Sequence, residues 1–184
     1  MKRTTNAVSS PEGELISETK RLRIVRLGID DSEFILSLFK SAGWMRFIGK
    51  RDSYSKTAAK KYLVEGPLIS YEENGWGLYK LILKSGNVPV GICGIVKRVE
   101  LTIPDLGFAL LPGYEGKGLA FESSQKILQL AKKKFELKKL LAITKVDNQR
   151  SINLLEKLGF VLQHKTTEQI KDGSALYAHS LILL

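Results

Sequence analysis

The strongest constraint on the fold is a glycine-rich segment that separates a strand pattern from a helical pattern. Residues 105–111 are mostly apolar, as in a short strand, and apolar residues recur at helical spacing from Ala120 onwards. The segment between them, residues 112–118, contains Gly116 and Gly118. These glycines let main-chain N–H groups approach a ligand closely, and the helix N-terminus adds roughly half a positive charge. The sequence therefore predicts an anion site here, with phosphate as the natural ligand.

Spacing tests two phosphate-binding patterns that contain such a loop. A Walker A loop needs a glycine five places before its Gly-Lys pair and a Ser or Thr after the lysine, but Leu111 and Gly118 stand at these places. A dinucleotide-binding fingerprint needs a small residue at position 121, where Phe121 is too large for close helix packing. The Walker A pattern is excluded, whereas Asp147 after the next strand leaves the dinucleotide pattern open as a weak alternative.

The first half of the chain alternates between strand and helix patterns. The alternation over residues 20–27 predicts a strand, and Asp30 and Asp31 can cap a helix that ends near Gly43. A second helix is expected over residues 54–64, ending before Gly66-Pro67. Two apolar runs, residues 76–83 and 88–96, are joined by a turn rich in Gly and Asn and predict a hairpin.

The second half completes a mixed α/β sheet. Residues 140–146 predict a strand, and Asn148 and Gly159 are suited to begin and end the helix that follows. Closing strands are expected over residues 160–164 and 175–183, around a turn at 171–173. Hairpins combined with one strand-helix-strand unit indicate a sheet that is not purely parallel.

Composition and length bound the class of protein. A chain of 184 residues, 43% hydrophobic and 26% charged, fits one soluble domain and excludes wholesale disorder. Residues 1–17 lack periodicity and are expected to form a flexible lead-in to a domain over residues 18–184. We find no apolar run long enough to span a membrane and no secretory signal, so a cytoplasmic protein is expected. One cysteine and two histidines argue against a metal site.

The charge balance favours an anionic partner. The chain has 29 Lys and Arg against 19 Asp and Glu, a formal net charge of +10. A solvated basic surface explains this charge as well as a ligand does, and nucleic acid, an anionic cofactor and an acidic protein all remain open. No recognition-helix or stacking-aromatic motif supports the nucleic-acid alternative.

Two separated motifs resemble those of the GNAT acetyltransferases. They are residues 105–120, DLGFALLPGYEGKGLA, and residues 148–160, NQRSINLLEKLGF. Within that superfamily the chain is most similar to the RimJ/RimL-like acetyltransferases of ribosomal proteins, which residues 19–24 also resemble. The likeness covers about residues 18–183. It implies a single-domain α/β (α+β) fold with a mixed, mostly antiparallel sheet, two splayed parallel strands and flanking helices.

The resemblance implies a site for acetyl-CoA where strands near 105–111 and 139–145 splay apart. In that family the pantetheine pairs with the main chain of one strand and the pyrophosphate meets loop amides, and Asn148 is a further cofactor contact. The corresponding residues here are Phe108, Ala109, Leu110 and Leu111 for pantetheine, and Gly116, Lys117, Gly118, Leu119 and Ala120 for pyrophosphate. This chain departs from the family at Glu115, where Arg or Gln is usual.

Acetyl transfer to an amine needs a base, a stabilised oxyanion and a proton for the leaving thiolate. The resemblance implies Asp105 as the base and Ser151 as the acid, with Glu100 a weaker candidate base. Each has a structural alternative: Asp105 as a strand-edge carboxylate after Pro104, and Ser151 as a polar residue in the first helical turn. A main-chain N–H near Leu110 is expected to stabilise the oxyanion.

The predicted function is acetyl transfer from acetyl-CoA to a primary amine, with direct attack in a ternary complex. A protein N-terminal α-amine and small-molecule amines remain open as acceptors, with residues 43–75 as one wall of their site. The alternatives are a CoA- or nucleotide-binding module without turnover and, less favoured, a basic nucleic-acid-binding domain. We expect a monomer or homodimer, a buried Cys93 and no membrane partner; Trp44, Trp76 and Tyr54 either line the acceptor site or pack.

Overall fold

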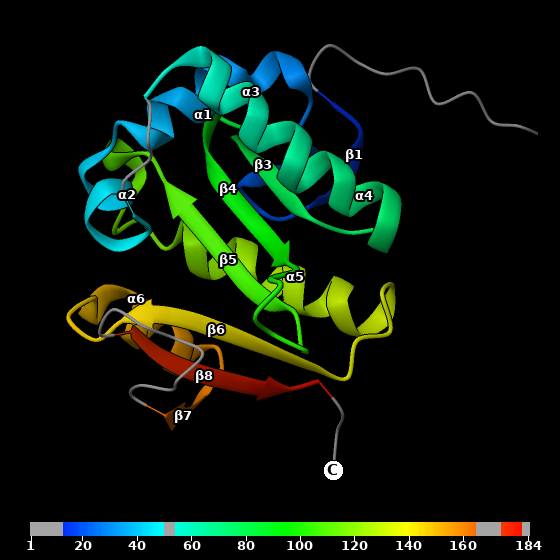
Figure 1. The fold of residues 1–184 in the computed structure, drawn as a ribbon, viewed down its shortest axis with the longest axis vertical. Helices are drawn as coiled ribbons and strands as arrows, with labels where there is room; N and C mark the ends of the chain where they lie inside the picture. Colours follow the sequence, from blue (N-terminus) through cyan, green and yellow to red (C-terminus); the bar gives the residue numbers. More distant parts are fainter. Residues whose placement is uncertain (1–12, 50–53, 165–173, 182–184) are drawn as a thin grey trace, which may run out of the picture.

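A computed structural model of the chain describes residues 13–49, 54–164 and 174–181, which form an eight-stranded sheet. Its strand order is β1-β2-β3-β4-β5-β6-β8-β7 (Figure 1). The strands are β1 (Leu15–Glu18), β2 (Leu22–Arg26), β3 (Leu78–Leu83), β4 (Val88–Val96), β5 (Asp105–Leu110), β6 (Lys139–Lys145), β7 (Val161–His164) and β8 (Ser174–Ser180). The helices are α1 (Ser32–Phe39), α2 (Ala42–Phe47), α3 (Lys56–Leu63), α4 (Ile69–Asn74), α5 (Leu119–Lys133) and α6 (Gln149–Lys157).

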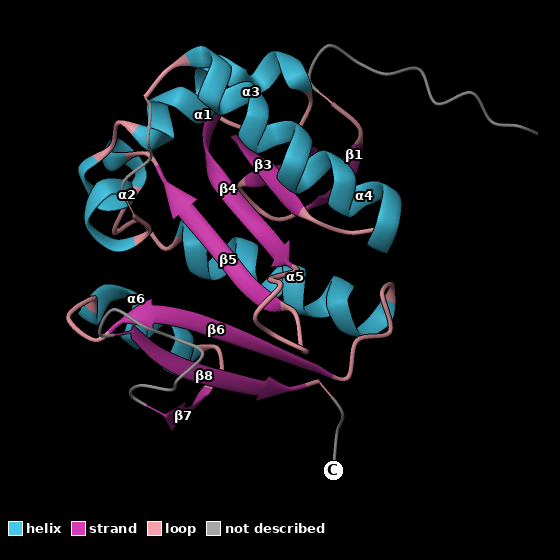
Figure 2. Ribbon diagram, viewed as in Figure 1, coloured by secondary structure: helices cyan, strands magenta, loops and turns pink. Residues whose placement is uncertain are grey.

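Every neighbouring strand pair is antiparallel except β5 and β6, which run parallel. Helices α3 and α4 lie over one face of the sheet and α5 lies behind it (Figure 2). The predicted fold class, a mixed and mostly antiparallel sheet flanked by helices, is therefore confirmed.

The two faces of the sheet carry separate apolar clusters. On one face, Leu38 and Phe39 of α1 pack with Leu63 of α3 and Ile92 of β4, all at most 2% exposed. On the other, Ile127 of α5 is fully buried in the cluster built on β2, β3, β4 and β6. Apolar side chains at helical spacing on each helix meet alternate residues of the strands, which fixes the order of the layers.

The structure corrects two boundaries near the N-terminus. Residues 15–17, expected within the flexible lead-in, belong to β1, which pairs with β2 through Leu15↔Val25 and Glu18↔Arg23. Residues 1–12 lie outside the described residues. Gly43 does not end a helix: α1 stops at Phe39, and Gly43 lies inside α2, where the side chain of Ser41 caps the first turn by accepting from Trp44 N.

The second helix does not end before Gly66-Pro67. A π-helical turn, Val64–Leu68, carries the chain into α4, and Pro67 is buried within it. The wider turn suits proline, which has no N–H to donate. Tyr71 of α4 anchors this extension, because its hydroxyl accepts from Leu27 N at 3.1 Å and donates to Leu78 O.

The remaining elements follow the predictions closely. The hairpin of β3 and β4, the strand–loop–helix unit of β5 and α5, and the Asn148 cap and Gly159 end of α6 are confirmed. The closing strands are present as β7 and β8. The predicted turn at 171–173 lies outside the described residues.

Gly94 shows why β4 contains small residues. It pairs with Leu78 of β3, and a Cβ added to it would meet the carbonyl oxygen of Gly77 and lie 2.7 Å from Leu78 Cα. Both are main-chain atoms, at the start of β3 and in the residue before it, so they cannot rotate away. Only glycine allows β3 and β4 to approach this closely.

We expect Gly94→Ala to lower the free energy of unfolding by about 1–3 kcal/mol or more, because it overpacks main chain. Urea denaturation of both proteins measures the change. Gly113→Ala is the matched control: a Cβ there meets nothing within 4 Å, so the change should stay within about 0.5 kcal/mol. Equal stability of the Gly94 variant and the wild type would contradict this packing account.

Candidate active site

The two parallel strands of the sheet are joined at one end only. β5 and β6 pair at Asp105↔Leu141, and Leu141 N donates to Pro104 O at 3.0 Å. Beyond this point the two strands diverge (Figure 1). The edge of β5 that faces β6 therefore has main-chain groups without a partner strand.

Alternation along β5 decides which main-chain groups face the gap. Leu111 N donates to Val90 O at 2.9 Å, so Leu111 and every second residue before it direct their main chain towards β4. Phe108 and Leu110 then direct theirs towards β6. The carbonyl of Leu111 also accepts from Tyr114 N at 2.9 Å, so both main-chain groups of Leu111 are engaged within the protein.

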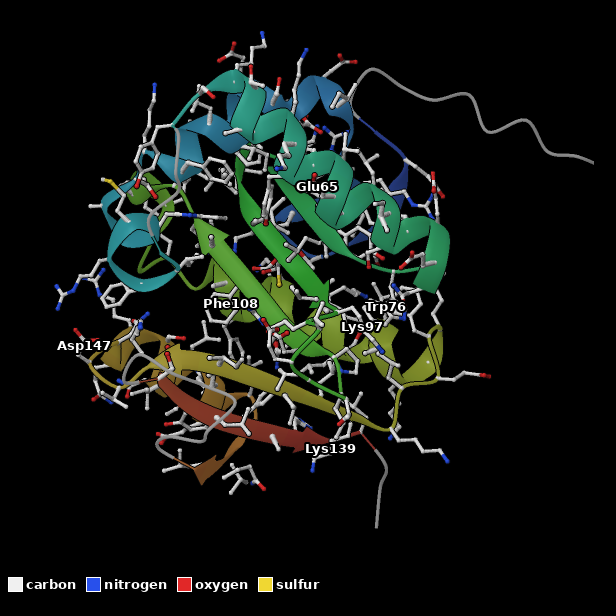
Figure 3. All side chains as sticks on the ribbon, viewed as in Figure 1. Glu65, Trp76, Lys97, Phe108, Lys139 and Asp147 are labelled. Atoms are coloured by element: carbon white, nitrogen blue, oxygen red, sulfur yellow. The ribbon has the colours of Figure 1, made fainter. Side chains whose placement is uncertain are left out.

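A cavity of about 680 Å³ occupies this part of the molecule, between β5, β6 and the helices α2, α3, α5 and α6. It brings together most of the predicted site residues, which come from segments far apart in the sequence. Leu111 and Lys117 do not line it. Those that do are Asp105, Phe108, Ala109, Leu110, Gly116, Gly118, Leu119, Ala120, Asn148 and Ser151. In Figure 3, Phe108 marks β5, and Asp147 lies past the end of β6 on the side where the strands diverge.

The glycine loop adopts the backbone that the sequence predicts for an anion site. Gly116 and Gly118 have φ of 71° and 74°, in the left-handed region that favours glycine. Gly118 precedes the first residue of α5, and among the described residues no side chain caps that helix. The N–H groups of its first turn therefore remain available to a ligand.

The far side of the loop is held by Arg21 of the N-terminal region. Its Nη1 donates to Lys117 O at 2.8 Å, and its Nε donates to Glu122 Oε2 at 2.6 Å. Glu122 Oε1 also accepts from Thr19 Oγ1 and from Arg21 N. Both oxygens of the Glu122 carboxylate are therefore engaged by Thr19 and Arg21, which tie the first turn of α5 to the segment before β2.

Asp105 lies at the closed end of the splay. It is 1% exposed, and Arg98 donates to its two oxygens from Nε at 2.9 Å and Nη2 at 3.2 Å. Burial raises the pKa of the Asp105 carboxyl, while the charge and hydrogen bonds of Arg98 oppose that rise. A carboxylate in these surroundings is a stronger base than one in water. Glu100, the weaker candidate, is exposed and does not line the cavity.

The start of α6 contributes Asn148 and Ser151 to the cavity. Asn148 Oδ1 accepts from Ser151 N at 3.2 Å, which confirms the predicted N-cap. Because Asn148 provides the cap, the Ser151 hydroxyl is not needed for it, and this hydroxyl makes no hydrogen bond to any residue that the structure describes. The side chain at the cavity wall is thus available to a ligand.

Two arginines that line the cavity were not predicted as site residues. Arg98 holds Asp105, and Arg150 donates from Nη1 to Glu115 Oε2 at 3.1 Å. Glu115 therefore does not stand alone in the loop. A local signal existed for Arg150, which lies within the second motif, but its pairing with a residue 35 positions away depends on the tertiary fold.

The helices before β3 form one wall of the cavity. Its lining there comes from Gly43, Trp44, Phe47, Ile48 and Tyr62, which narrows the expected wall of residues 43–75 to α2 and α3. Trp76, only 7% exposed, belongs to the main apolar cluster, and Tyr54 packs against the other cluster, so neither lines the cavity. Trp44 lines the cavity and, at 3% exposed, also packs within the second apolar cluster.

Cys93 is fully buried, and burial raises the pKa of its thiol to about 11, so it is a packing residue as predicted. In residues 13–49, 54–164 and 174–181 we find no group of three His, Cys, Asp or Glu side chains suited to a metal ion. The same residues include no helix with the length and apolar character needed to cross a bilayer.

Comparison with known proteins identifies the family. The model of the acetyltransferase (GNAT) domain matches residues 21–161. YjdG of Bacillus subtilis (strain 168), named an uncharacterized N-acetyltransferase, is 36% identical over 64 residues, which are 35% of this chain and 38% of that protein. The aligned segment thus spans well under half of that relative.

Solved acetyltransferases share the whole fold. An acetyltransferase from Agrobacterium tumefaciens strain C58 has a TM-score of 0.77 and 20% identity, with 97% of this chain and 99% of that chain covered. RimL, a ribosomal L7/L12 α-N-protein acetyltransferase solved with coenzyme A, has a TM-score of 0.72 and 16% identity. The match covers 91% of this chain and 98% of that chain. At these identities the likeness shows the fold alone. Because the family model matches most of the sequence, the chain belongs to the GNAT acetyltransferase family.

Proposed function

We propose that the protein transfers an acetyl group from acetyl-CoA to a primary amine by direct attack in a ternary complex. One observation carries the proposal: the unpaired edge of β5 leads directly into a glycine loop and an uncapped helix N-terminus, within a single cavity. This arrangement offers hydrogen bonds to a pantetheine arm and positive potential to a diphosphate. Membership of the GNAT family supports the same cofactor.

In this proposal, acetyl-CoA is bound mainly by main-chain groups of β5, of the glycine loop and of the first turn of α5. Phe108 and Leu110 face the gap and pair with the pantetheine arm, while Leu111 is left out because its own main chain is engaged. The amides of the loop and of the first turn of α5 hold the diphosphate. Lys117 contributes through its backbone, since its side chain lies over the Tyr114 ring and outside the cavity. Asn148 adds its side-chain amide.

The transfer needs three groups from the protein. The amine nitrogen attacks the carbonyl carbon of the thioester, so an N–C bond forms and the C–S bond breaks. Asp105 takes the surplus proton of the nitrogen through a water molecule, because its carboxylate is buried behind Arg98. The N–H of Leu110 stabilises the oxyanion. Ser151 donates its hydroxyl proton to the departing sulfur, which leaves as the thiol, and the proton held by Asp105 passes through solvent water to restore the Ser151 hydroxyl.

The charges around the cavity favour acceptors that are not strongly cationic. The carboxylates of Asp105 and Glu115 each pair with an arginine, so the lining offers no surplus negative charge to a polyamine. An α-amine with a pKa near 8 is about one-tenth neutral at pH 7, whereas a lysine amine is almost entirely protonated. We therefore favour a protein N-terminal α-amine or a small neutral amine, in keeping with a RimJ/RimL-like enzyme.

Free-thiol release from acetyl-CoA tests the function directly, with N-terminal peptides, amino sugars and polyamines as acceptors. We expect amine-dependent release. We also expect Gly118→Asp to abolish both release and CoA binding, because it adds a negative charge to the loop whose amides hold the diphosphate and places a side chain against Arg21. Gly118→Ala is the control for backbone strain, since it has the same φ of 74° to adopt and no charge. Binding of CoA without release for any acceptor would favour a binding module instead.

Ser151→Ala tests the role of the hydroxyl at the start of α6. We expect kcat to fall by about 10- to 100-fold, within the range of general acid–base catalysis, with little change in acetyl-CoA affinity. The Asn148 cap remains, so the helix and the stability of the protein should be preserved. A kcat equal to that of the wild type would return Ser151 to a purely structural role.

The pH profile of kcat tests Asp105 and its partner. Since a base must be deprotonated, activity is lost as the pH falls through the Asp105 pKa, which burial raises. Arg98 lowers that pKa, so Arg98→Gln should move the acid limb to higher pH, while Arg98→Lys should keep it near its wild-type position. Asp105→Asn should remove the limb. An acid limb that is unchanged in both Arg98→Gln and Asp105→Asn would exclude Asp105 as the base.

A further inference from the structure

The side chain of Glu115 joins the two walls of the cavity. Its Oε2 accepts from Arg150 Nη1 of α6 at 3.1 Å, while its Oε1 would lie 3.2 Å from a Cβ placed on Gly43 of α2. The carboxylate thus fits between α2 and α6 because position 43 has no side chain. Both Glu115 and Arg150 line the cavity.

This ion pair lies next to the proposed diphosphate site. Glu115 directly precedes Gly116, the first of the two left-handed glycines of the loop. Arg150 is the second residue of α6, on the facing wall. A carboxylate next to a diphosphate repels it, whereas a guanidinium matches phosphate oxygens in charge and in its forked geometry. The two partners therefore respond to the same ligand in opposite ways.

The pair is weak enough to exchange. The Arg150 side chain is 85% exposed and that of Glu115 is 36% exposed. Ion pairs between side chains this exposed contribute little to stability, so breaking one costs little. A charge-assisted bond from guanidinium to phosphate inside the cavity exceeds that cost.

We propose that Arg150 is a ligand of the donor's diphosphate, held ready by Glu115 and transferred from that carboxylate to phosphate oxygens when the donor binds. The inference rests on the proposed function, because it assumes a CoA donor at the glycine loop. It gives Glu115 a defined effect: this residue orients Arg150 in the free protein and weakens donor binding by its negative charge.

Calorimetric titration with CoA tests this role in four proteins: the wild type, Glu115→Gln, Arg150→Gln and the double variant. Glu115→Gln should bind CoA more tightly, by about threefold, since a repulsive charge is removed. Arg150→Gln should bind it about tenfold more weakly, the cost of a charge-assisted hydrogen bond. The double variant decides between two roles of Arg150. If Arg150 contacts the diphosphate, the double variant binds more weakly than Glu115→Gln; if Arg150 only neutralises Glu115, the two bind equally and the proposal is overturned.

Arg46→Gln is the matched control. Arg46 donates to Asp147 at 3.2 Å, in another exposed ion pair between α2 and the loop before α6, but it does not line the cavity. Its loss should leave CoA affinity within about twofold of the wild type, as expected for a surface pair. A drop equal to that of Arg150→Gln would mean that any rim arginine acts through general charge, which would also overturn the proposal.

A truncated donor separates this proposal from the proposed function. S-acetylpantetheine has the thioester but no diphosphate, so its kcat/KM should be the same in Arg150→Gln and in the wild type. A loss with this donor equal to the loss with acetyl-CoA would show that Arg150 acts elsewhere than at the diphosphate. Failure of the wild type to bind CoA at all would refute the proposed function itself, whereas normal CoA binding that ignores both Glu115 and Arg150 refutes only their role.

Discussion

The site depends on the separation of β5 from β6. Strands in a sheet normally satisfy each other's main chain, and β5 does so with β4 along its whole length, but it meets β6 only at Asp105↔Leu141. The unpaired edge is costly unless a ligand or water satisfies it. The edge ends at a left-handed glycine loop and at the uncapped start of α5, so unsatisfied donors are gathered in one cavity. The proposed donor site is therefore built largely from main-chain groups.

Arginine–carboxylate pairs then set the charge of this site. Arg98 holds Asp105 at the closed end, and Arg150 holds Glu115 at the open end. The Asp105 carboxylate of the first pair is buried, and Arg98 favours its charged form where burial disfavours it. The second is exposed and easily exchanged. In the proposed function, the first pair serves proton transfer and the second serves donor binding.

The sequence predicted the parts of the fold that depend on local patterns. The β3–β4 hairpin, the strand–loop–helix unit and the Asn148 cap follow from periodicity, glycine positions and capping chemistry. Local rules were wrong at Gly66-Pro67, where burial of Pro67 and Tyr71 outweighs the tendency of proline to end a helix. They were also wrong for residues 15–17, which are ordered by pairing with β2. The pairing of Glu115 with Arg150 could not be predicted, because it depends on how segments 35 positions apart pack. Arg98 lies only seven positions before Asp105, but no periodicity or capping rule reveals that the turn between β4 and β5 brings the two side chains together.

A structure of the protein with bound CoA tests the central claim most directly. The account predicts a diphosphate within hydrogen-bonding distance of the main-chain nitrogens between positions 116 and 120, with the pantetheine arm against Phe108 and Leu110. A ligand bound elsewhere, or a loop that stays blocked by the Glu115 side chain at saturating CoA, would contradict it.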